Sequence, residues 1–442
     1  MQWNKLLSSK RLGLEQFHNL QHDTRTEFQR DYDRLIFSPP FRRLQNKTQV
    51  FPLPGSVFVH NRLTHSLEVS CVGRSVGNLI AAKLQERYPK SGVMFDAIGA
   101  IVAAACLAHD LGNPPFGHSG ERAIATFFSE GAGKEWRTEL SAPQWNDFIH
   151  FEGNANTFRL LTHRFEGRRE GGFVLTYSTL ASIIKYPYES QYAGEKKKFG
   201  FFQSETDAFQ RIASELGIIK NPYDEHRYAR HPLVFPVEAA DDICYQIMDL
   251  EDAFKLHIFQ FDETRDVLMS FLPQKRQERA KTVLHSIRDL NEQIAYLRST
   301  VIGCLIDACV ETFIQKETDI LSGHFTQPLI EQIDKPLRLA YDRCAVLAKE
   351  KIYNSHQALD IELAGFKIVS ELLEVLINAV THPQKSYSQH LLRRIPAQYN
   401  TAANTLYERI QAVVDYISGM TDLYALDLYR NINGISLPSI NY

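Results

Sequence analysis

The feature that most constrains the fold is the apolar run DAIGAIVAAACLAHD at residues 96–110 of this 442-residue chain. Its apolar residues occupy every side of a helix, so such a helix must be surrounded by other elements. We expect Asp96 to cap its N-terminus, and the helix to stop at Gly112 because Pro114 and Pro115 forbid continuation. The run therefore predicts a central buried helix that ends in a group of titratable residues.

Helical periodicity extends over most of the remaining sequence. Apolar residues recur at helical spacing over residues 63–88 and 237–259, and further periodic segments broken by turn sequences run from 263 to 429. These patterns predict an all-α fold. We expect residues 1–260 to form a core with an N-terminal extension, and residues 261–442 to form a C-terminal helical region packed on that core.

One segment, residues 186–202, interrupts the helical pattern and carries three lysines at 196–198. We expect a mobile loop there, with a β-hairpin as the alternative. The lysines are expected to be solvated, and the alternative is that they attract phosphates or single-stranded nucleic acid.

Composition excludes several classes of protein. The chain is 44% apolar and 23% charged, as in ordinary globular proteins, and its formal charge of −3 gives no general attraction to nucleic acid or to anionic lipid. An export signal and a membrane-spanning run are both missing, so we expect a cytoplasmic protein with no membrane partner. The cysteines form no C-x-x-C pair and are expected to be reduced thiols; they are Cys71, Cys106, Cys244, Cys304, Cys309 and Cys344.

Two histidines and an aspartate fall at positions that helical spacing turns inward. His65 shares a helical face with Val69 and Val72, while His109 and Asp110 end the buried helix. An ionised aspartate in such a place needs a cation, and no lysine or arginine is near in sequence. A divalent metal is the simplest answer. The alternatives are a core histidine bonded to a carbonyl at His65, and a helix end whose Asp110 binds local amides.

A polar stripe marks the helix predicted at residues 237–259. Asp241, Tyr245 and Asp249 are spaced by four residues, opposite the apolar face of the same helix. Such a stripe is expected to line a cavity, with a solvated face as the alternative.

The set His65, His109–Asp110 and Asp241 resembles the H…HD…D pattern of the HD superfamily of metal-dependent phosphohydrolases. More narrowly, the chain resembles the deoxyguanosine triphosphate triphosphohydrolases. The segments that carry this resemblance are FRRLQNKTQVFPLPG, RLTHSLEV, HDLGNPPFGHSGE, HFEGNA, EAADDICYQIMDLEDA and DYISGMTDLYALDLYR. They span residues 25–260 in blocks and return at 415–430. The resemblance implies an HD-domain helical bundle with additional C-terminal helices.

The resemblance also implies a reaction and residues for it. The family hydrolyses a deoxynucleoside triphosphate to the deoxynucleoside and tripolyphosphate, with one divalent metal ion per site. By position, His65, His109, Asp110 and Asp241 resemble its metal ligands, and His118 and Glu121 its catalytic pair. Residues similar to its substrate contacts are Gln49, Tyr245 and Asp249 at the deoxyribose, and Arg62 and Lys185 at the phosphates.

The segment from His109 to Glu121 is suited to this chemistry. If His118 and Glu121 open a helix, their spacing of three lets them hydrogen-bond, and the glutamate then fixes the imidazole tautomer. Pro114 and Pro115 preset the distance from His109. Two roles for His118 stay open, namely positioning the attacking water and protonating the leaving 5′-oxygen. The alternative is a histidine in a rigid turn.

Two further motifs allow two interpretations each. HFEGNA, at residues 150–155, is expected either to surround His118 or to cap a helix. The segment at 415–430 is expected to pack in the core, and the resemblance adds that it closes the pocket or a subunit contact.

Other functions and partners stay open at this stage. The rivals are another HD phosphohydrolase, acting on other nucleotides, and a nucleotide-sensing or single-strand-binding regulator without catalysis. The metal is manganese, magnesium or another first-row ion. The substrate is dGTP or several dNTPs, and the loop around residues 53–65 departs from guanine-selective members. The resemblance also implies a homo-oligomer, a hexamer or a tetramer, and leaves open an activating nucleotide or single-stranded DNA.

Overall fold

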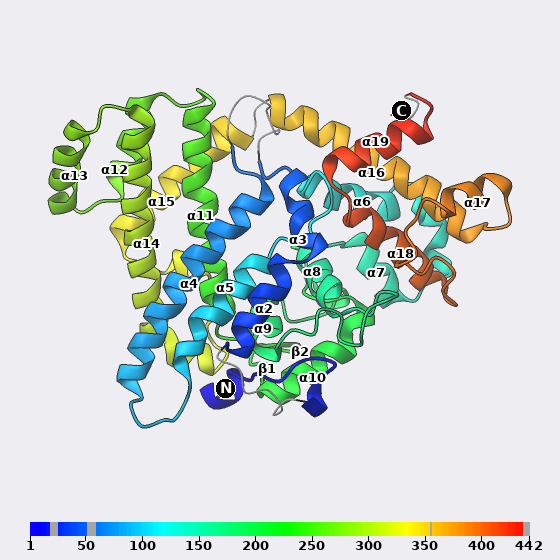
Figure 1. Ribbon diagram of the computed structural model, residues 1–442, viewed down its shortest axis with the longest axis horizontal. Coiled ribbons are helices and arrows are strands. Elements are labelled where there is room, and N and C mark those ends of the chain that lie inside the picture. The colour runs from blue at the N-terminus through cyan, green and yellow to red at the C-terminus, as the bar shows by residue number, and fades with distance from the viewer. Residues whose placement is uncertain (18–24, 51–58, 354–355, 436–442) are drawn as a thin grey trace.

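A computed structural model describes residues 1–17, 25–50, 59–353 and 356–435 (Figure 1). The expectation for the loop around residues 53–65 falls largely outside them. In the first half of the chain the helices are α1 (Trp3–Leu6), α2 (Glu27–Ile36), α3 (Pro39–Arg43), α4 (Arg62–Arg87), α5 (Ile98–Ala108), α6 (His118–Ser129), α7 (Ala142–Ile149), α8 (Gly153–Thr162), α9 (Tyr177–Ile183) and α10 (Thr206–Leu216).

A short hairpin, β1 (Lys220–Asn221) with β2 (Asp224–Tyr228), separates these helices from the second half. The later helices are α11 (Val234–Lys255), α12 (Phe261–Ser270), α13 (Gln274–Ser286), α14 (Leu290–Leu321), α15 (Lys335–Ala348), α16 (His356–Thr381), α17 (Ser386–Leu392), α18 (Leu406–Ser418) and α19 (Asp422–Ile432). The all-α prediction is confirmed.

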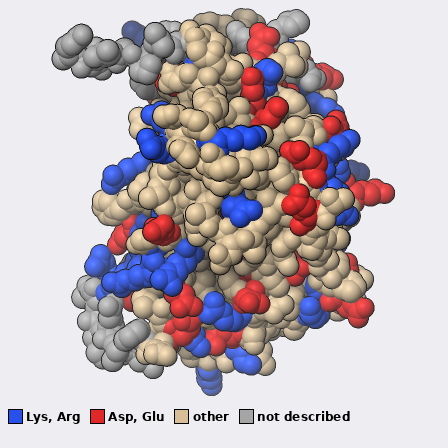
Figure 2. Space-filling view, turned by 90° about the vertical axis from the view of Figure 1, so that its right-hand side faces the viewer, with Lys and Arg blue, Asp and Glu red and all other residues tan. Residues whose placement is uncertain are grey.

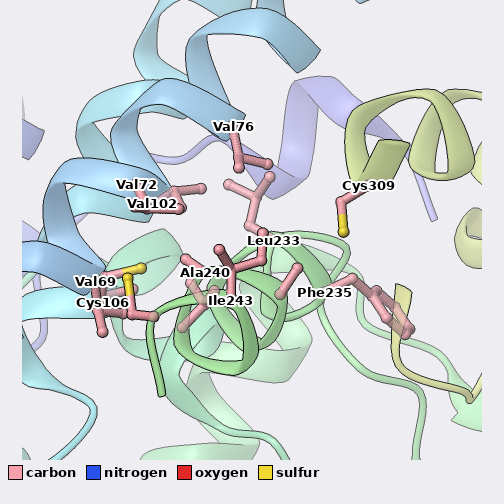
Figure 3. Close-up of a cluster of buried hydrophobic side chains, with 14 of the residues drawn as sticks. Val69, Val72, Val76, Val102, Cys106, Leu233, Phe235, Ala240, Ile243 and Cys309 are labelled. Atoms are coloured by element: carbon pink, nitrogen blue, oxygen red, sulfur yellow. The ribbon is translucent and has the colours of Figure 1, made fainter. Parts of the chain in front are cut away.

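Helix α5 lies in the middle of the molecule, as its apolar sequence predicts. Almost all its side chains are buried, and it packs against α2, α4, α9 and α11. Figure 3 shows the centre of this packing, where Val69 and Val76 of α4 face Val102 and Cys106 of α5 and Ile243 of α11.

The ends of α5 differ from the prediction. Asp96 lies exposed inside a 3₁₀ turn, Phe95–Ala97, and does not cap the helix; the N-cap is Ala97, without a side-chain bond. At the other end α5 stops at Ala108, and hydrogen-bonded turns rather than helix lead to Pro114. The physical reason is that the polar groups of 109–113 bond to neighbouring elements instead of continuing the helical ladder.

The segment at 186–202 is not a hairpin. Glu189 and Phe201 form an isolated parallel bridge, and the antiparallel pair lies later, at 220–228. Phe199, Phe201 and Phe202 are buried, so the segment is drawn into the interior. Lys198 is only partly exposed and pairs with the buried carboxylate of Glu152, whereas the prediction had all three lysines solvated.

The C-terminal helices share their cores with the first part of the chain. One apolar cluster joins α4, α5 and α11 to α12–α15, and a second joins α6–α8 to α16–α19, which lie at the opposite end of Figure 1. Arg159 of α8 pairs with Asp415 of α18 at 2.7 Å inside the second cluster. The boundary at residue 260 stays a prediction; among the described residues, both clusters combine side chains from before and after it.

The surface charge is mixed and the cysteines are unpaired, as the composition predicts. On the face in Figure 2, charges of both signs are interspersed, with one gathering of Lys and Arg at an edge. All six cysteines are free thiols, and only Cys71 is exposed. Within the described ranges, no helix combines the length and apolarity needed to cross a membrane.

A buried neutral histidine makes the stability of the fold sensitive to pH. Nε2 of His231 donates to the Leu6 carbonyl (3.1 Å), and Nδ1 accepts from Leu233 N (3.2 Å). Burial lowers the pKa of His231 to about 4. Between pH 6.5 and 4 the unfolded chain therefore binds a proton that the folded chain does not, so stability falls as pH falls.

We predict that His231 contributes a loss of up to about 1.4 kcal/mol of unfolding free energy per pH unit in this window. Urea unfolding at several pH values measures it. His231→Gln is expected to flatten the pH dependence, whereas the exposed control His285→Gln leaves it unchanged. Equal slopes for wild type and His231→Gln would contradict the prediction.

Candidate metal centre and active site

Four predicted side chains converge from three helices. His65 lies in the first turns of α4, His109 and Asp110 directly follow α5, and Asp241 lies on α11. Asp241 Oδ1 is 3.1 Å from His65 Nε2 and 3.4 Å from His109 Nε2, and Asp110 Oδ1 is 3.7 Å from His109 Nε2. Ligand atoms of His65, His109 and Asp110 all lie within 4.8 Å of one another. This is the two-imidazole, two-carboxylate set that the sequence predicts.

The chemistry of this set fits a divalent cation. Nδ1 of His109 donates to the Cys106 carbonyl at 2.6 Å, which directs Nε2 toward the carboxylates as a ligand requires. Burial opposes a proton on His109, yet Asp110 and Asp241 raise its pKa to about 9. The two histidines in turn hold the pKa of Asp241 well below its usual value despite burial. The carboxylates thus favour positive charge at this point.

Part of the positive charge expected beside Asp110 comes from an arginine that is distant in sequence. Arg62, at the start of α4, places Nη1 2.7 Å from Asp110 Oδ2, and Asn113 Nδ2 donates to Asp110 Oδ1 at 2.5 Å. Arg62 is 48 positions away in sequence, and only the packing of α4 on α5 brings it close. Burying an unpaired carboxylate costs on the order of several kcal/mol. The ion pair with Arg62 offsets part of this cost for Asp110.

These residues open into a cavity of about 460 Å³. Of the predicted site residues it is lined by Gln49, Arg62, His65, Asp110, His118, Asp241 and Tyr245. His109 is only partly exposed and is not among the lining residues. The C-terminal region contributes Ile361 and Glu362 of α16 to the wall.

Two predicted substrate contacts lie away from this cavity wall. Lys185, after α9, pairs with Glu238 of α11 at 2.9 Å, one helical turn before Asp241. Asp249 is buried one turn beyond Tyr245, on the side of α11 toward Cys344. The polar stripe on α11 therefore lines the cavity with Asp241 and Tyr245, and the roles of Lys185 and Asp249 stay predictions.

His118 and Glu121 open α6 as predicted but do not bond to each other among the described hydrogen bonds. The Glu121 carboxylate accepts from Gly153 N (2.9 Å) and lies 4.0 Å from Lys198 Nζ. Its pKa is raised by burial, against the pull of Lys198. His118 is exposed to the cavity, and its pKa is lowered by partial desolvation and by the positive charges of Arg62 and Lys198.

The HFEGNA motif contacts Glu121 of this pair and the neighbouring Lys198. Gly153 N binds Glu121, and Glu152 Oε2 lies 2.5 Å from Lys198 Nζ. The side chain of Glu152 stands at the N-cap of α8 without capping it. The interpretation that the motif surrounds the His118 region is thus favoured over the helix-cap alternative.

Three charged residues of the site were not predicted there. Lys198 sits beside Glu121, and its only sequence signal is the lysine run at 196–198. Asp242 lines the cavity next to Asp241, and burial with Glu238 raises its pKa to about 8. Arg122 reaches Glu362 at 2.8 Å across the cavity wall. Their positions depend on long-range packing that helical spacing does not reveal.

Comparison with known proteins agrees with this geometry. Residues 62–168 match the HD domain model, and residues 333–431 match the phosphohydrolase-associated domain model. A deoxyguanosinetriphosphate triphosphohydrolase-like protein of Pseudomonas aeruginosa is 38% identical over 449 residues, covering 99% of this chain and 100% of the relative. The chain belongs to this deoxyguanosinetriphosphate triphosphohydrolase-like family. The family resemblance drawn from the motifs is confirmed.

Other relatives cover the chain to a similar extent. A protein of Synechocystis with the same "-like" description is 39% identical over 99% of this chain and 100% of its own length. A Yersinia enterocolitica protein described as a deoxyguanosinetriphosphate triphosphohydrolase is 30% identical over 92% of this chain and 93% of its own length. The family and its HD domain support a phosphohydrolase with a divalent metal.

Metal binding should depend on Asp241. We predict that Asp241→Asn weakens Mn²⁺ binding by more than about tenfold, because one of the two carboxylates facing both imidazoles loses its charge. Isothermal titration calorimetry measures this. Asp242→Asn, next to it on α11, is the matched control and should retain binding. Equal weakening by both variants would contradict the assignment of Asp241 as a ligand.

Proposed function

We propose that this protein hydrolyses deoxynucleoside triphosphates to the deoxynucleoside and tripolyphosphate, with a divalent cation held by His65, His109, Asp110 and Asp241. The observation that carries the proposal is that three of these four residues, His65, Asp110 and Asp241, line one cavity. Arg62 and Gln49 line the same cavity, and Gln49 Oε1 has no hydrogen-bond partner among the described residues. The names of the relatives support the same reaction class.

The reaction requires charge neutralisation at the phosphates, an attacking water and a proton for the departing 5′-oxygen. The chemistry that a bound cation supplies is polarisation of a phosphate oxygen and a lowered pKa of water. Arg62 lies beside the ligands with its guanidinium on the cavity wall and is proposed to bind phosphate oxygens. Lys185 pairs with Glu238, which lies one helical turn before Asp241 on α11. Lys185 is proposed to add to the positive charge near the phosphates.

His118 is proposed to manage the proton of the reaction, with Glu121 as its partner. The imidazole faces the cavity from the first residue of α6. Its two roles, holding the attacking water and protonating the 5′-oxygen, both stay open. Glu121 is bonded to Gly153 N, so we propose that it acts on His118 mainly through its charge.

The sugar is proposed to be recognised by Gln49, Tyr245 and Asp249. The Gln49 Oε1 atom is buried and has no hydrogen-bond partner among the described residues, so it suits a hydroxyl donor such as the 3′-hydroxyl. Tyr245 lies on the same wall and is proposed to crowd the 2′ position. Asp249 is proposed to support the 3′-hydroxyl side.

The products test the reaction. The chain is incubated with dATP, dCTP, dGTP and dTTP, singly and in mixtures, with Mg²⁺ or Mn²⁺. We predict the release of deoxynucleoside and tripolyphosphate, measured by chromatography. Orthophosphate or pyrophosphate would instead favour another HD phosphohydrolase, and the absence of any product would favour a regulator. Activity only in mixtures would show activation by a second nucleotide.

Sugar discrimination tests the place of Tyr245. We predict that Tyr245→Ala lowers the preference for a deoxyribonucleotide over the matching ribonucleotide by about tenfold or more in kcat/KM, because the space beside C2′ opens. Tyr341→Ala, on α15, is a control of the same size outside the cavity lining. An unchanged preference in Tyr245→Ala would remove Tyr245 from the sugar site.

We also propose that the protein works in the cytoplasm as a homo-oligomer, a hexamer or a tetramer. In support, α16 exposes Leu359, Leu363 and Phe366 at a spacing of four and three residues. Such an apolar stripe is typical of a surface that another subunit covers. Light scattering of the purified chain measures the assembly.

A further inference from the structure

Asp422, the first residue of α19, joins two loops that are far apart in sequence. Its Oδ2 accepts from the backbone N–H of Thr48 and its Oδ1 accepts from that of Phe116, both at 2.9 Å. The side chain is 8% exposed, so water competes little for these bonds. One carboxylate from the C-terminal region thus uses both oxygens on backbone donors of the first 120 residues.

Both loops carry proposed site residues. Thr48 and its neighbour Gln49 line the cavity, as do Phe116 and the two residues that follow it, Gly117 and His118. Asp422 itself is not among the lining residues. Its described hydrogen bonds instead go to the backbone of the two loops that carry Gln49 and His118.

A buried lysine strengthens the same junction. Lys47 is 2% exposed, and its Nζ donates to the carbonyls of Asn113 (2.5 Å) and Ser418 (2.9 Å). Lys47 O in turn accepts from Arg62 N at the start of α4. The loops and the C-terminal helices are thereby connected twice within a few residues.

The loop before His118 needs such support. Phe116 has φ 62° and Gly117 has φ 57°, and a bulky residue in this left-handed region costs roughly 1–3 kcal/mol. The Phe116 ring is also confined by α16, where a Cβ at Gly365 would lie only 2.6 Å from Phe116 Cβ. Without the bond from Phe116 N to Asp422, the chain can relax and move His118.

We propose that Asp422 is a positioning residue that holds Gln49 and His118 in their places through the amides of Thr48 and Phe116. This inference rests on the proposed function for the roles of Gln49 and His118. The proposal gives Asp422 of α19 a part in the site that requires no contact between its side chain and the substrate.

The variants form a graded series. Asp422→Ala removes both acceptors. Asp422→Asn keeps the size but replaces one acceptor oxygen by an amide group that cannot accept, so one of the two bonds is lost. Asp427→Asn, an exposed residue of the same helix, is the control with the same change of charge.

The first readout needs no substrate. Hydrogen exchange by mass spectrometry is expected to show faster exchange in peptides that contain residues 47–50 and 113–118, most in Asp422→Ala and less in Asp422→Asn. Peptides from α4 and α5 and all peptides of Asp427→Asn should exchange as in wild type. Unchanged exchange at both loops in both Asp422 variants would overturn the proposal.

The second readout separates positioning from loss of folded protein. We compare kcat/KM for a deoxynucleoside triphosphate with that for its 2′,3′-dideoxy analogue, which lacks the hydroxyl assigned to Gln49. This preference should fall by at least about threefold in the Asp422 variants. A smaller folded fraction lowers both rates equally and leaves the ratio unchanged, so an unchanged ratio in active variants overturns the proposal.

Failure of the proposed function is distinguishable from failure of this inference. If Asp422→Ala does not fold, Asp422→Asn carries both tests. A wild-type chain that releases no deoxynucleoside overturns the proposed function and with it the catalytic part of this proposal. The exchange experiment still decides whether Asp422 holds the two loops.

Discussion

The site depends on the balance of charge around two carboxylates at the bottom of the cavity. Asp110 and Asp241 face His65 and His109 from three helices, and Arg62 pairs with the outer oxygen of Asp110. Buried carboxylates are tolerated only where positive charge or donors surround them. This requirement draws the start of α4, the end of α5 and the middle of α11 to one point, and the apolar contacts of the same helices hold them there.

The other wall of the cavity comes from the end of the chain. Helix α16 bonds to Ser119 and Arg122 of α6 through Glu362, and Asp422 binds the loops before α4 and α6. Helix α6, which carries His118, buries its apolar side in the cluster with α16–α19. The matched HD domain therefore contains three of the four proposed metal ligands, while the region that matches the phosphohydrolase-associated domain contacts α6 and the two loops beside the cavity.

Much of this arrangement follows from local patterns. The apolar run of α5 predicts its burial, and spacing by four predicts that Asp241 and Tyr245 share one face of α11. Asp249 continues the same spacing but is buried and does not line the cavity. The periodic pattern on α11 is longer than the part of the helix that borders the cavity. Spacing also suggests a hydrogen bond between His118 and Glu121. In the structure the Glu121 carboxylate instead accepts from Gly153 N and lies 4.0 Å from Lys198 Nζ.

The sequence by itself determined the helical class, the central position of α5, the family and the residue types of a metal site, since these depend on periodicity and on motifs within short segments. Only the tertiary structure decided which charged groups find which partners: Arg62 pairs with Asp110, Lys198 lies near Glu121, and Asp422 accepts hydrogen bonds from the backbone N–H groups of Thr48 and Phe116. The reason is physical. A helical period is set by bonds four residues apart, whereas a buried ion pair is set by which helices pack together.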